Sequence, residues 1–348
     1  MQASVKTYLS IQYLRAVAAI MVVGLHAGHG VDGLYPGFSN FEVGHAGVDI
    51  FFVISGFIML NATIGSSPGE FLRRRFIRIW PLYAIATLAT YAFFTRFDPG
   101  AIRAYDASDL IQSLAFIPHD SPRAPGNAWP FLIPGWTLNY EMFFYVIFAI
   151  GIWTHRRFST TAIIILAFMA VGFLIRPTDL ALKTYTNPLM LEFLAGMAIA
   201  RCGDQLPKMA IGMLPLGCVG LFFVHVDSGM RFITMGVPAM MIVAGAIALE
   251  NRVTLPYLRW LKSLGDASYA IYLFQIIALT MATMALWHLP IRGPLQIVVM
   301  ILLSVGGSVA AGLIAHSYLE RPIIEGLIHR RQNKGVSGPT AASTALNR

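Results

Sequence analysis

The chain has 348 residues, of which 56% are hydrophobic and only 12% are charged, and its formal net charge is +8. So large an apolar share excludes an ordinary soluble domain, and two cysteines, Cys202 and Cys218, are too few for a disulfide framework. The positive charge has two possible explanations, a nucleic-acid partner or a signal that orients the chain in a membrane.

Apolar runs recur along the whole chain, and each is long enough to cross a hydrocarbon core of about 30 Å as a helix. Turn and charge signals such as "NATIGSSPGE" and "RCGDQLPK" separate them. The sequence therefore predicts an all-α, polytopic integral membrane helical bundle of about ten transmembrane helices. The expected spans are 11–28, 46–63, 77–95, 135–153, 160–176, 186–202, 209–226, 230–249, 264–287 and 294–317.

The basic residues indicate how this bundle is oriented. When the N-terminus is placed in the cytoplasm, most of the 25 lysine and arginine residues fall on the cytoplasmic side, and an even number of spans returns the C-terminus to that side. The charge is thus explained by orientation, so no nucleic-acid partner is expected. Residues 1–331 are expected to form a single transmembrane domain with one long outer loop, 96–134, and residues 332–348 a disordered cytoplasmic tail.

The first span, in "YLRAVAAIMVVGLHAG", holds Arg15 and His26 eleven residues apart. At that separation they lie within roughly 20° of one helix face and about 16 Å apart along the axis. Ionisable residues inside a membrane span are costly and so indicate a functional site. In the structural alternative, Arg15 snorkels to the interface and His26 bonds a neighbouring helix. The shared face favours function.

The stretch "FLRRRFIRIWPLY", residues 71–83, carries Arg74, Arg75 and Arg78 at helical spacings of three and four. These side chains project together from the entrance of a helix. They suit either a basic cluster that fixes orientation and contacts anionic lipid, or a clamp for phosphate oxygens. From the residues alone, the orientation signal is favoured.

Glu141 lies in "PGWTLNYEMFFYVIF", inside an otherwise apolar span that follows the long outer loop. An unpaired carboxylate there would be protonated or very costly, so a partner is expected. If the partner is His26, the pair suits general-base chemistry; a purely structural pair between helices is equally compatible with the spacing. Asp49 and Ser55, in "GVDIFFVISGF", are further buried polar candidates. No set of residues has the spacing of metal ligands, so no metal site is expected.

Taken together, these motifs resemble the membrane-bound acyltransferase 3 family, and most closely its exopolysaccharide O-acetyltransferase branch, over residues 8–322. Arg15 and His26 match the family's Arg-x10-His signature, and Arg75 with Arg78 matches its Arg-x-x-Arg element. The other matching stretches are "GVDIFFVISGF", "GWTLNYEMFFY", "NPLMLEFLAGM", "LGDASYAIYL" and "LERP". The chain departs from the common family pattern at Gln12, which stands three residues before Arg15, and at Gln275, where many members have histidine.

The resemblance implies an enzyme of a bacterial-type cytoplasmic (inner) membrane. Its reaction would move an acyl group, usually acetyl, from acetyl-CoA to a sugar hydroxyl of an exported polysaccharide or its lipid-linked precursor. Acetyl-CoA would be a co-substrate, and no permanently bound cofactor is expected. Membrane lipid is a further expected partner, and the chain could form a homo-oligomer or associate with the polysaccharide export machinery.

The resemblance also assigns roles to individual residues. It implies that His26 is catalytic and that Arg15, Arg75 and Arg78 serve donor binding or the transfer route. We therefore expect His26 to act as general base, with Glu141 as its orienting carboxylate and Arg15 beside it. Arg74 is grouped with the donor-binding residues. The candidates for binding the acceptor are Asn139, Trp136, Asp49 and Ser55.

A transporter or flippase for a glycan or a small anion is the main alternative, because arginine and histidine inside the membrane also suit an anion pathway. The sequence shows neither internal repeats nor paired broken spans, which counts against a transporter. A non-catalytic member of a polysaccharide export complex is a weaker alternative.

Overall fold

The structure, a computed structural model, describes residues 8–32, 35, 41–62, 65–223, 231–288 and 292–327. Within these ranges the regular elements are all helices, apart from one isolated bridge between Ser121 and Ala124. The all-helical prediction is confirmed for this part of the chain. The predicted tail, 332–348, lies outside the described residues.

The helices follow one another closely, and several are short 3-10 or π turns. In chain order they are α1 (Leu9–Asp32), η1 (Glu42–His45), α2 (Ala46–Ala62), α3 (Pro68–Phe97), α4 (Pro99–Ile102), α5 (Ala107–Leu114), η2 (Ile133–Gly135), α6 (Trp136–Trp153), α7 (Arg157–Ile175), α8 (Leu180–Tyr185), α9 (Met190–Cys202), η3 (Gly203–Gln205), η4 (Lys208–Gly212), α10 (Met213–Leu221), η5 (Phe232–Gly236), α11 (Val237–Glu250), α12 (Arg259–Asp266), α13 (Ser268–His288), α14 (Pro294–Ala315) and η6 (His316–Glu320).

Eight helices in the described ranges are long and apolar enough to cross a membrane. They include α1, α2, α3, α6, α7, α11, α13 and α14. The two other predicted spans, 186–202 and 209–226, coincide with α9 and with η4–α10, which are shorter than the roughly 20 residues that a crossing helix needs. Residues 224–226 of the second one lie outside the described ranges. α9 packs against α2, and α10 packs against α11.

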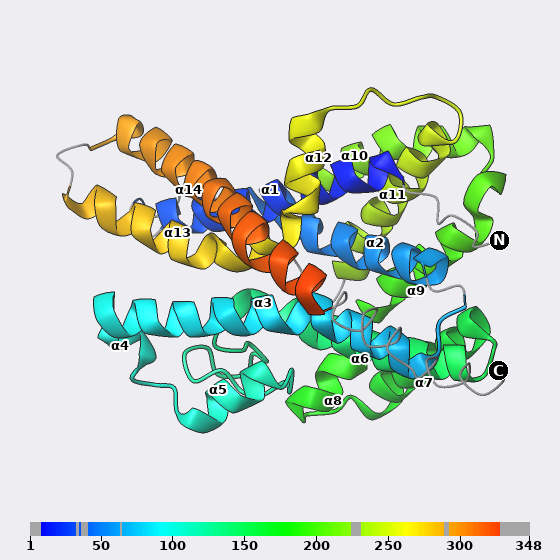
Figure 1. The fold of residues 1–348 in the computed structure, drawn as a ribbon, viewed down its shortest axis with the longest axis horizontal. Helices are drawn as coiled ribbons and strands as arrows, with labels where there is room; N and C mark the ends of the chain where they lie inside the picture. The colour runs from blue at the N-terminus through cyan, green and yellow to red at the C-terminus, as the bar shows by residue number, and fades with distance from the viewer. Residues whose placement is uncertain are drawn as a thin grey trace, which may run out of the picture.

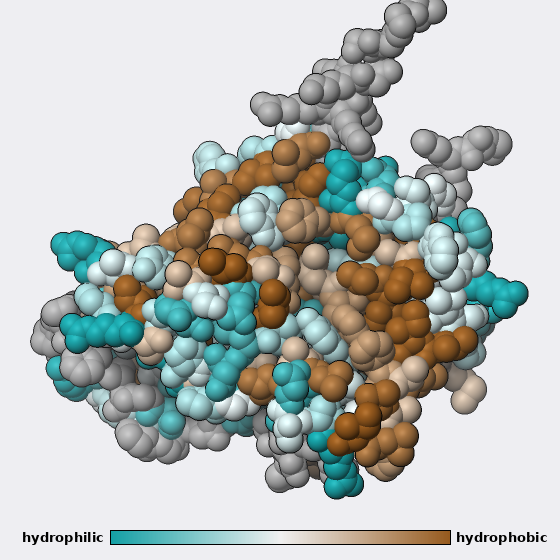
Figure 2. Space-filling model, turned by 90° about the horizontal axis from the view of Figure 1, so that it is seen from below, coloured by the Kyte–Doolittle hydropathy of each residue, from teal (hydrophilic) through white to brown (hydrophobic). Residues whose placement is uncertain are grey.

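Apolar side chains also cover much of the molecular surface, as the brown areas of Figure 2 show. α7 is the clearest case, because Phe173 and Leu174 are 77% and 78% exposed. A soluble protein rarely presents such a face to water, whereas in a bilayer the lipid tails are as apolar as these side chains. The surface therefore agrees with a multi-pass membrane protein.

Figure 1 shows α1 and α3 as long rods separated by α13 and α14, with α2, α6 and α9 gathered at one end of the molecule. α1 contacts α2, α13 and α14, and α3 contacts α6 and α13. Aromatic rings connect α2, α6 and α9: the ring centre of Phe193 in α9 lies 4.7 Å from that of Phe52 in α2 and 4.4 Å from that of Phe144 in α6. This packing holds α1, α2, α3, α6 and α13 around a common interior space.

The long connection 96–134 is ordered and folds back onto α3. Tyr83 donates a hydrogen bond to the carbonyl oxygen of Ser113 at 3.1 Å, and the Trp80 indole donates to that of Leu114 at 3.1 Å. A capping box formed by Asp106 and Asp109 begins α5. The connection therefore packs against α3.

α2 and α9 cross with almost no space between their backbones. A Cβ atom at Gly56 would collide with the carbonyl oxygen of Phe193, and one at Gly196 would collide with that of Val53. Only glycine at both positions permits this approach.

We expect Gly56→Ala to lower the free energy of unfolding by about 3 kcal/mol, because the two helix backbones would have to move apart. Thermal unfolding of the detergent-solubilised protein, followed by loss of the monodisperse chromatographic peak, measures the effect. Gly306→Ala in α14 is the matched control, since a Cβ there has no heavy atom within 4 Å. Equal melting temperatures for the two variants would contradict this account of the α2–α9 crossing.

Candidate active site

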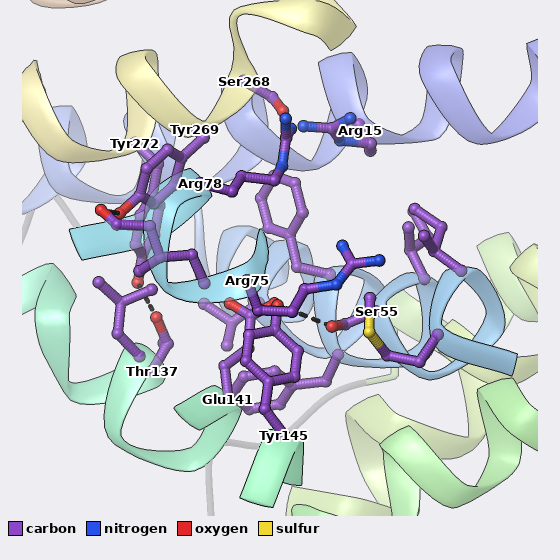
Figure 3. A pocket seen from close by; sticks show the side chains of 18 of the residues that line it. Arg15, Ser55, Arg75, Arg78, Thr137, Glu141, Tyr145, Ser268, Tyr269 and Tyr272 are labelled. Carbon is purple, nitrogen blue, oxygen red and sulfur yellow. Dashed lines mark hydrogen bonds between the residues drawn. The ribbon is translucent and has the colours of Figure 1, made fainter. Parts of the chain in front are cut away.

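A cavity of about 390 Å³ lies between α1, α2, α3, α6 and α13. Figure 3 shows its polar side chains converging from these helices, with Arg15 and Arg78 at one end and Glu141, Tyr145 and Ser55 further along. Its polar lining residues are Gln12, Arg15, Ser55, Arg75, Arg78, Thr137, Glu141, Tyr145, Ser268, Tyr269 and Tyr272. It has the size and the mixture of polar and apolar groups typical of a small-molecule site.

The start of α3 determines which arginines reach the cavity. Ser67 caps the helix by accepting a hydrogen bond from the Glu70 amide at 3.3 Å. Glu70 in turn accepts hydrogen bonds from Arg73 at 2.9 Å and from Arg74 at 2.7 Å. The Arg74 side chain is 60% exposed and does not line the cavity. The expected grouping of Arg74 with the donor-binding arginines is therefore not seen.

Arg75 and Arg78, three residues apart on the other face of α3, do line the cavity. Arg78 lies near Arg15 of α1, and both line the cavity. Arg15 has one hydrogen bond, to Gln12 at 3.4 Å, and among the described residues neither Arg15 nor Arg78 forms an ion pair. Two guanidinium groups side by side without a carboxylate form a binding site for an anion.

Glu141 of α6 lies deeper in the same cavity. Its Oε1 atom accepts a hydrogen bond from Ser55 at 2.9 Å and another from the Tyr145 hydroxyl. Tyr145 is one turn along α6 from Glu141, a spacing from which the sequence could have indicated the contact. Ser55 comes from α2, so this contact fixes how α2 and α6 meet at the cavity wall.

The structure does not bring Glu141 to His26. The ring of His26 lies 6.0 Å from that of His29, which lies 6.2 Å from that of His45, and His26 does not line the cavity. His45 precedes Ser55 by ten residues in the η1–α2 segment, so the histidines and the Glu141 contact are about 15 Å apart along that segment. The expectation that Glu141 orients His26 is therefore incorrect for this structure.

The remaining acceptor-binding candidates do not line the cavity, and two of them, Asp49 and Trp136, are linked to His45 through Arg231. Asp49 is fully buried and forms an ion pair with Arg231 at 2.8 Å. Arg231 also donates to the carbonyl oxygen of His45 at 3.4 Å and lies over the ring of Trp136 at 5.6 Å. Asn139 is buried, and its Oδ1 atom has no hydrogen-bond partner within the described residues.

Arg231 was not among the residues expected at the site. Its position at the start of the apolar run 232–249, together with the buried acid Asp49, was the available signal. Tyr269 and Tyr272 were not expected at the site either, although both lie in the stretch "LGDASYAIYL" that matches the family. Tyr272 donates to the carbonyl oxygen of Pro134 at 2.9 Å and lies 3.0 Å from the Thr137 hydroxyl.

Phe51 of α2 and Tyr272 of α13 both line the cavity. Their rings are in edge contact at 6.2 Å. Along α2, Phe51 lies between Ser55 and His45, and Val48, one turn nearer to His45, also lines the cavity. The site therefore has two parts, an arginine-lined cavity and a cluster of histidines, and His26, His29 and His45 do not line the cavity.

Comparisons with known proteins show the family. A family profile described as "Acyltransferase domain" matches residues 8–313. The chain is 33% identical over 312 residues to the exopolysaccharide production protein ExoZ of Rhizobium meliloti (strain 1021), which covers 87% of this chain and 96% of that protein. It is 27% identical over 202 residues to Protein 2 in picA locus of Rhizobium radiobacter, covering 51% of this chain and 98% of that protein. No solved structure matches the chain.

The family profile spans nearly the whole chain, and the similarity to ExoZ covers both proteins almost completely. The protein therefore belongs to the acyltransferase 3 family and is an acyltransferase.

Proposed function

We propose that the protein is an integral-membrane O-acyltransferase that moves an acetyl group from cytosolic acetyl-CoA to a sugar hydroxyl of an exported polysaccharide or its lipid-linked precursor. The observation that carries the proposal is the cavity whose Arg15 and Arg78 have no carboxylate partner among the described residues. Coenzyme A carries phosphates, which bind guanidinium groups strongly. ExoZ is a protein of exopolysaccharide production, which supports a polysaccharide as the acceptor.

The positive-inside rule supports the same arrangement of donor and acceptor. With the N-terminus in the cytoplasm of a bacterial-type inner membrane, Arg15 and the first turns of α3 lie at the cytoplasmic side, where acetyl-CoA is present. His26 then lies about 16 Å further across the membrane. The acetyl thioester would enter from the Arg15 end, and the acceptor would approach from the histidine end.

The reaction needs a base at the acceptor hydroxyl. As the sugar oxygen attacks the thioester carbonyl carbon, the imidazole of His26 takes the hydroxyl proton, the C–S bond breaks, and the coenzyme A thiolate recovers a proton on leaving. His26 fits this role because its imidazole can accept a proton and because, in the described residues, it has no carboxylate partner. Because His26 does not line the cavity in this structure, side chains between the cavity and His26 must move for the two reactants to meet.

Release of free coenzyme A by the purified protein in lipid nanodiscs tests the proposal. Acetyl-CoA alone should release little free coenzyme A. Acetyl-CoA together with polysaccharide from a strain that lacks the gene for this protein should give steady release of coenzyme A. Mass spectrometry of that polysaccharide should show added acetyl groups. If the protein instead moved labelled glycan across vesicle membranes and released no coenzyme A, the transporter alternative would replace this proposal.

A further inference from the structure

The middle of the cavity holds a carboxylate and a guanidinium that face the same space without pairing. Glu141 and Arg75 both line it, but no ion pair joins them within 4.0 Å. Oppositely charged groups this deep in a protein normally pair unless other groups hold them. Each of the two is held in this way.

Glu141 is held by hydroxyl groups on one side only. Ser55, at 2.9 Å, and Tyr145 both donate to its Oε1 atom, and no described residue donates to Oε2. A carboxylate has lone pairs on both oxygens. Oε2 therefore remains available to accept a hydrogen bond from a bound molecule in the cavity.

Arg75 is held by aromatic rings rather than by hydrogen bonds. Its guanidinium carbon lies 5.6 Å from the ring centre of Phe71 and 5.9 Å from that of Tyr145, and its buried Nε has no acceptor among the described residues. Cation–π contact fixes the group but leaves its N–H donors unused. An acceptor oxygen brought by a ligand would satisfy them.

A ligand that suits both groups must offer an N–H donor to Glu141 and a carbonyl acceptor to Arg75. A phosphate does not qualify, because the carboxylate would repel it, whereas a secondary amide carries both groups. The amides of acyl-CoA lie in its pantetheine arm, between the phosphates and the thioester. Glu141 and Arg75 line the same cavity as Arg15 and Arg78, so one bound acyl-CoA can contact all four side chains.

We infer that Glu141 and Arg75 bind the amide groups of the pantetheine arm, so that Glu141 is a donor-binding residue and not the partner of His26. The inference rests on the proposed function, since it takes acyl-CoA as the donor. The amide N–H donates to Oε2 of Glu141, the amide carbonyl accepts from Arg75, and Ser55 and Tyr145 position the carboxylate.

Two ligands separate this inference from general donor binding. Coenzyme A carries phosphates and pantetheine, whereas adenosine 3′,5′-bisphosphate carries phosphates without the arm. Titration calorimetry of the nanodisc protein measures both dissociation constants. We expect Glu141→Gln to weaken coenzyme A binding by at least roughly tenfold, because a charge-assisted hydrogen bond is lost. The dissociation constant of the bisphosphate should stay within about twofold of the wild-type value, which also shows that the variant is folded.

Tyr145→Phe provides a second variant, because it removes one hydroxyl that holds Oε1 without removing the carboxylate. It should weaken coenzyme A binding by a smaller factor and leave the bisphosphate unaffected. Tyr318→Phe is its matched control, since Tyr318 is 76% exposed and far from the cavity lining. If Glu141→Gln changes the dissociation constants of both ligands equally, or changes neither, the assignment of Glu141 to the amides is overturned. If the wild-type protein binds neither ligand, acyl-CoA is not the donor, and the proposed function fails together with this inference.

Discussion

Arg78→Ala is expected to lower kcat/KM for acetyl-CoA by roughly 100-fold, because it removes two charge-assisted hydrogen bonds to phosphate. Arg78 lines the cavity beside Arg15 and makes no ion pair with any described residue. Replacing Arg78 therefore breaks no ion pair with a described residue that could by itself explain a loss of activity. Steady-state release of coenzyme A at several acetyl-CoA concentrations measures the change, which should be seen mainly in KM.

Arg74→Ala is the matched control for this variant. Arg74 is four residues away on the same helix, but it is paired with Glu70 and turned out of the cavity. Its replacement should leave kcat/KM within about twofold, as is usual for exposed ion pairs. Arg78→Lys should recover part of the activity, since an ammonium supplies charge without the two-pronged fork. Equal losses for Arg74→Ala and Arg78→Ala would show that the cluster acts through membrane orientation or lipid contact instead.

His26→Ala is expected to reduce kcat by roughly 10²- to 10⁴-fold, the usual contribution of a positioned general base. Coenzyme A binding should be unchanged, because His26 does not line the arginine-containing cavity. The combination of lost turnover and retained affinity distinguishes a catalytic base from a residue that shapes the donor site. Single-turnover transfer of radiolabelled acetyl to the polysaccharide, together with coenzyme A calorimetry, measures both quantities.

His155→Asn is a suitable control for this variant. His155 is exposed in the turn between α6 and α7, and asparagine tolerates its positive φ of 57°. It should retain full turnover. Unchanged kcat in His26→Ala would remove the histidine from the mechanism while leaving the donor-binding proposal intact.

Periodicity within a single helix could be read from the sequence with some success. It identified Arg75 and Arg78 on one face of α3, and the apolar sequence around Asp49 and Glu141 identified a fully buried and a half-buried acid. It did not reveal that Glu70 would capture Arg74, because the same spacing of three to four residues serves both groupings. The choice was made by the capped start of α3, which places Glu70 in the first turn.

Contacts between helices could not be read in this way. The pairing of Glu141 with His26 was expected from chemistry alone, whereas the structure pairs Glu141 with Ser55 and Tyr145. Which helices meet, and at what height, depends on close approaches such as that of Gly56 to α9, which no helical periodicity encodes. Similarly, hydropathy gave ten apolar runs of similar appearance, but α9 and α10 are shorter than a membrane crossing.

The aromatic contact between Phe51 and Tyr272 bears on the electrochemical gradient across the membrane. An enzyme that takes one substrate from each side of a membrane must not become a water-filled pore, because protons and salts would leak through it and dissipate the electrochemical gradient. In the proposed arrangement, with the arginines toward the cytoplasm and the histidines further across the membrane, the insulation of the bilayer depends on the side chains packed between them, among which Phe51 and Tyr272 are in edge contact. Widening it, for example by Phe51→Gly, should therefore make proteoliposomes permeable to small ions.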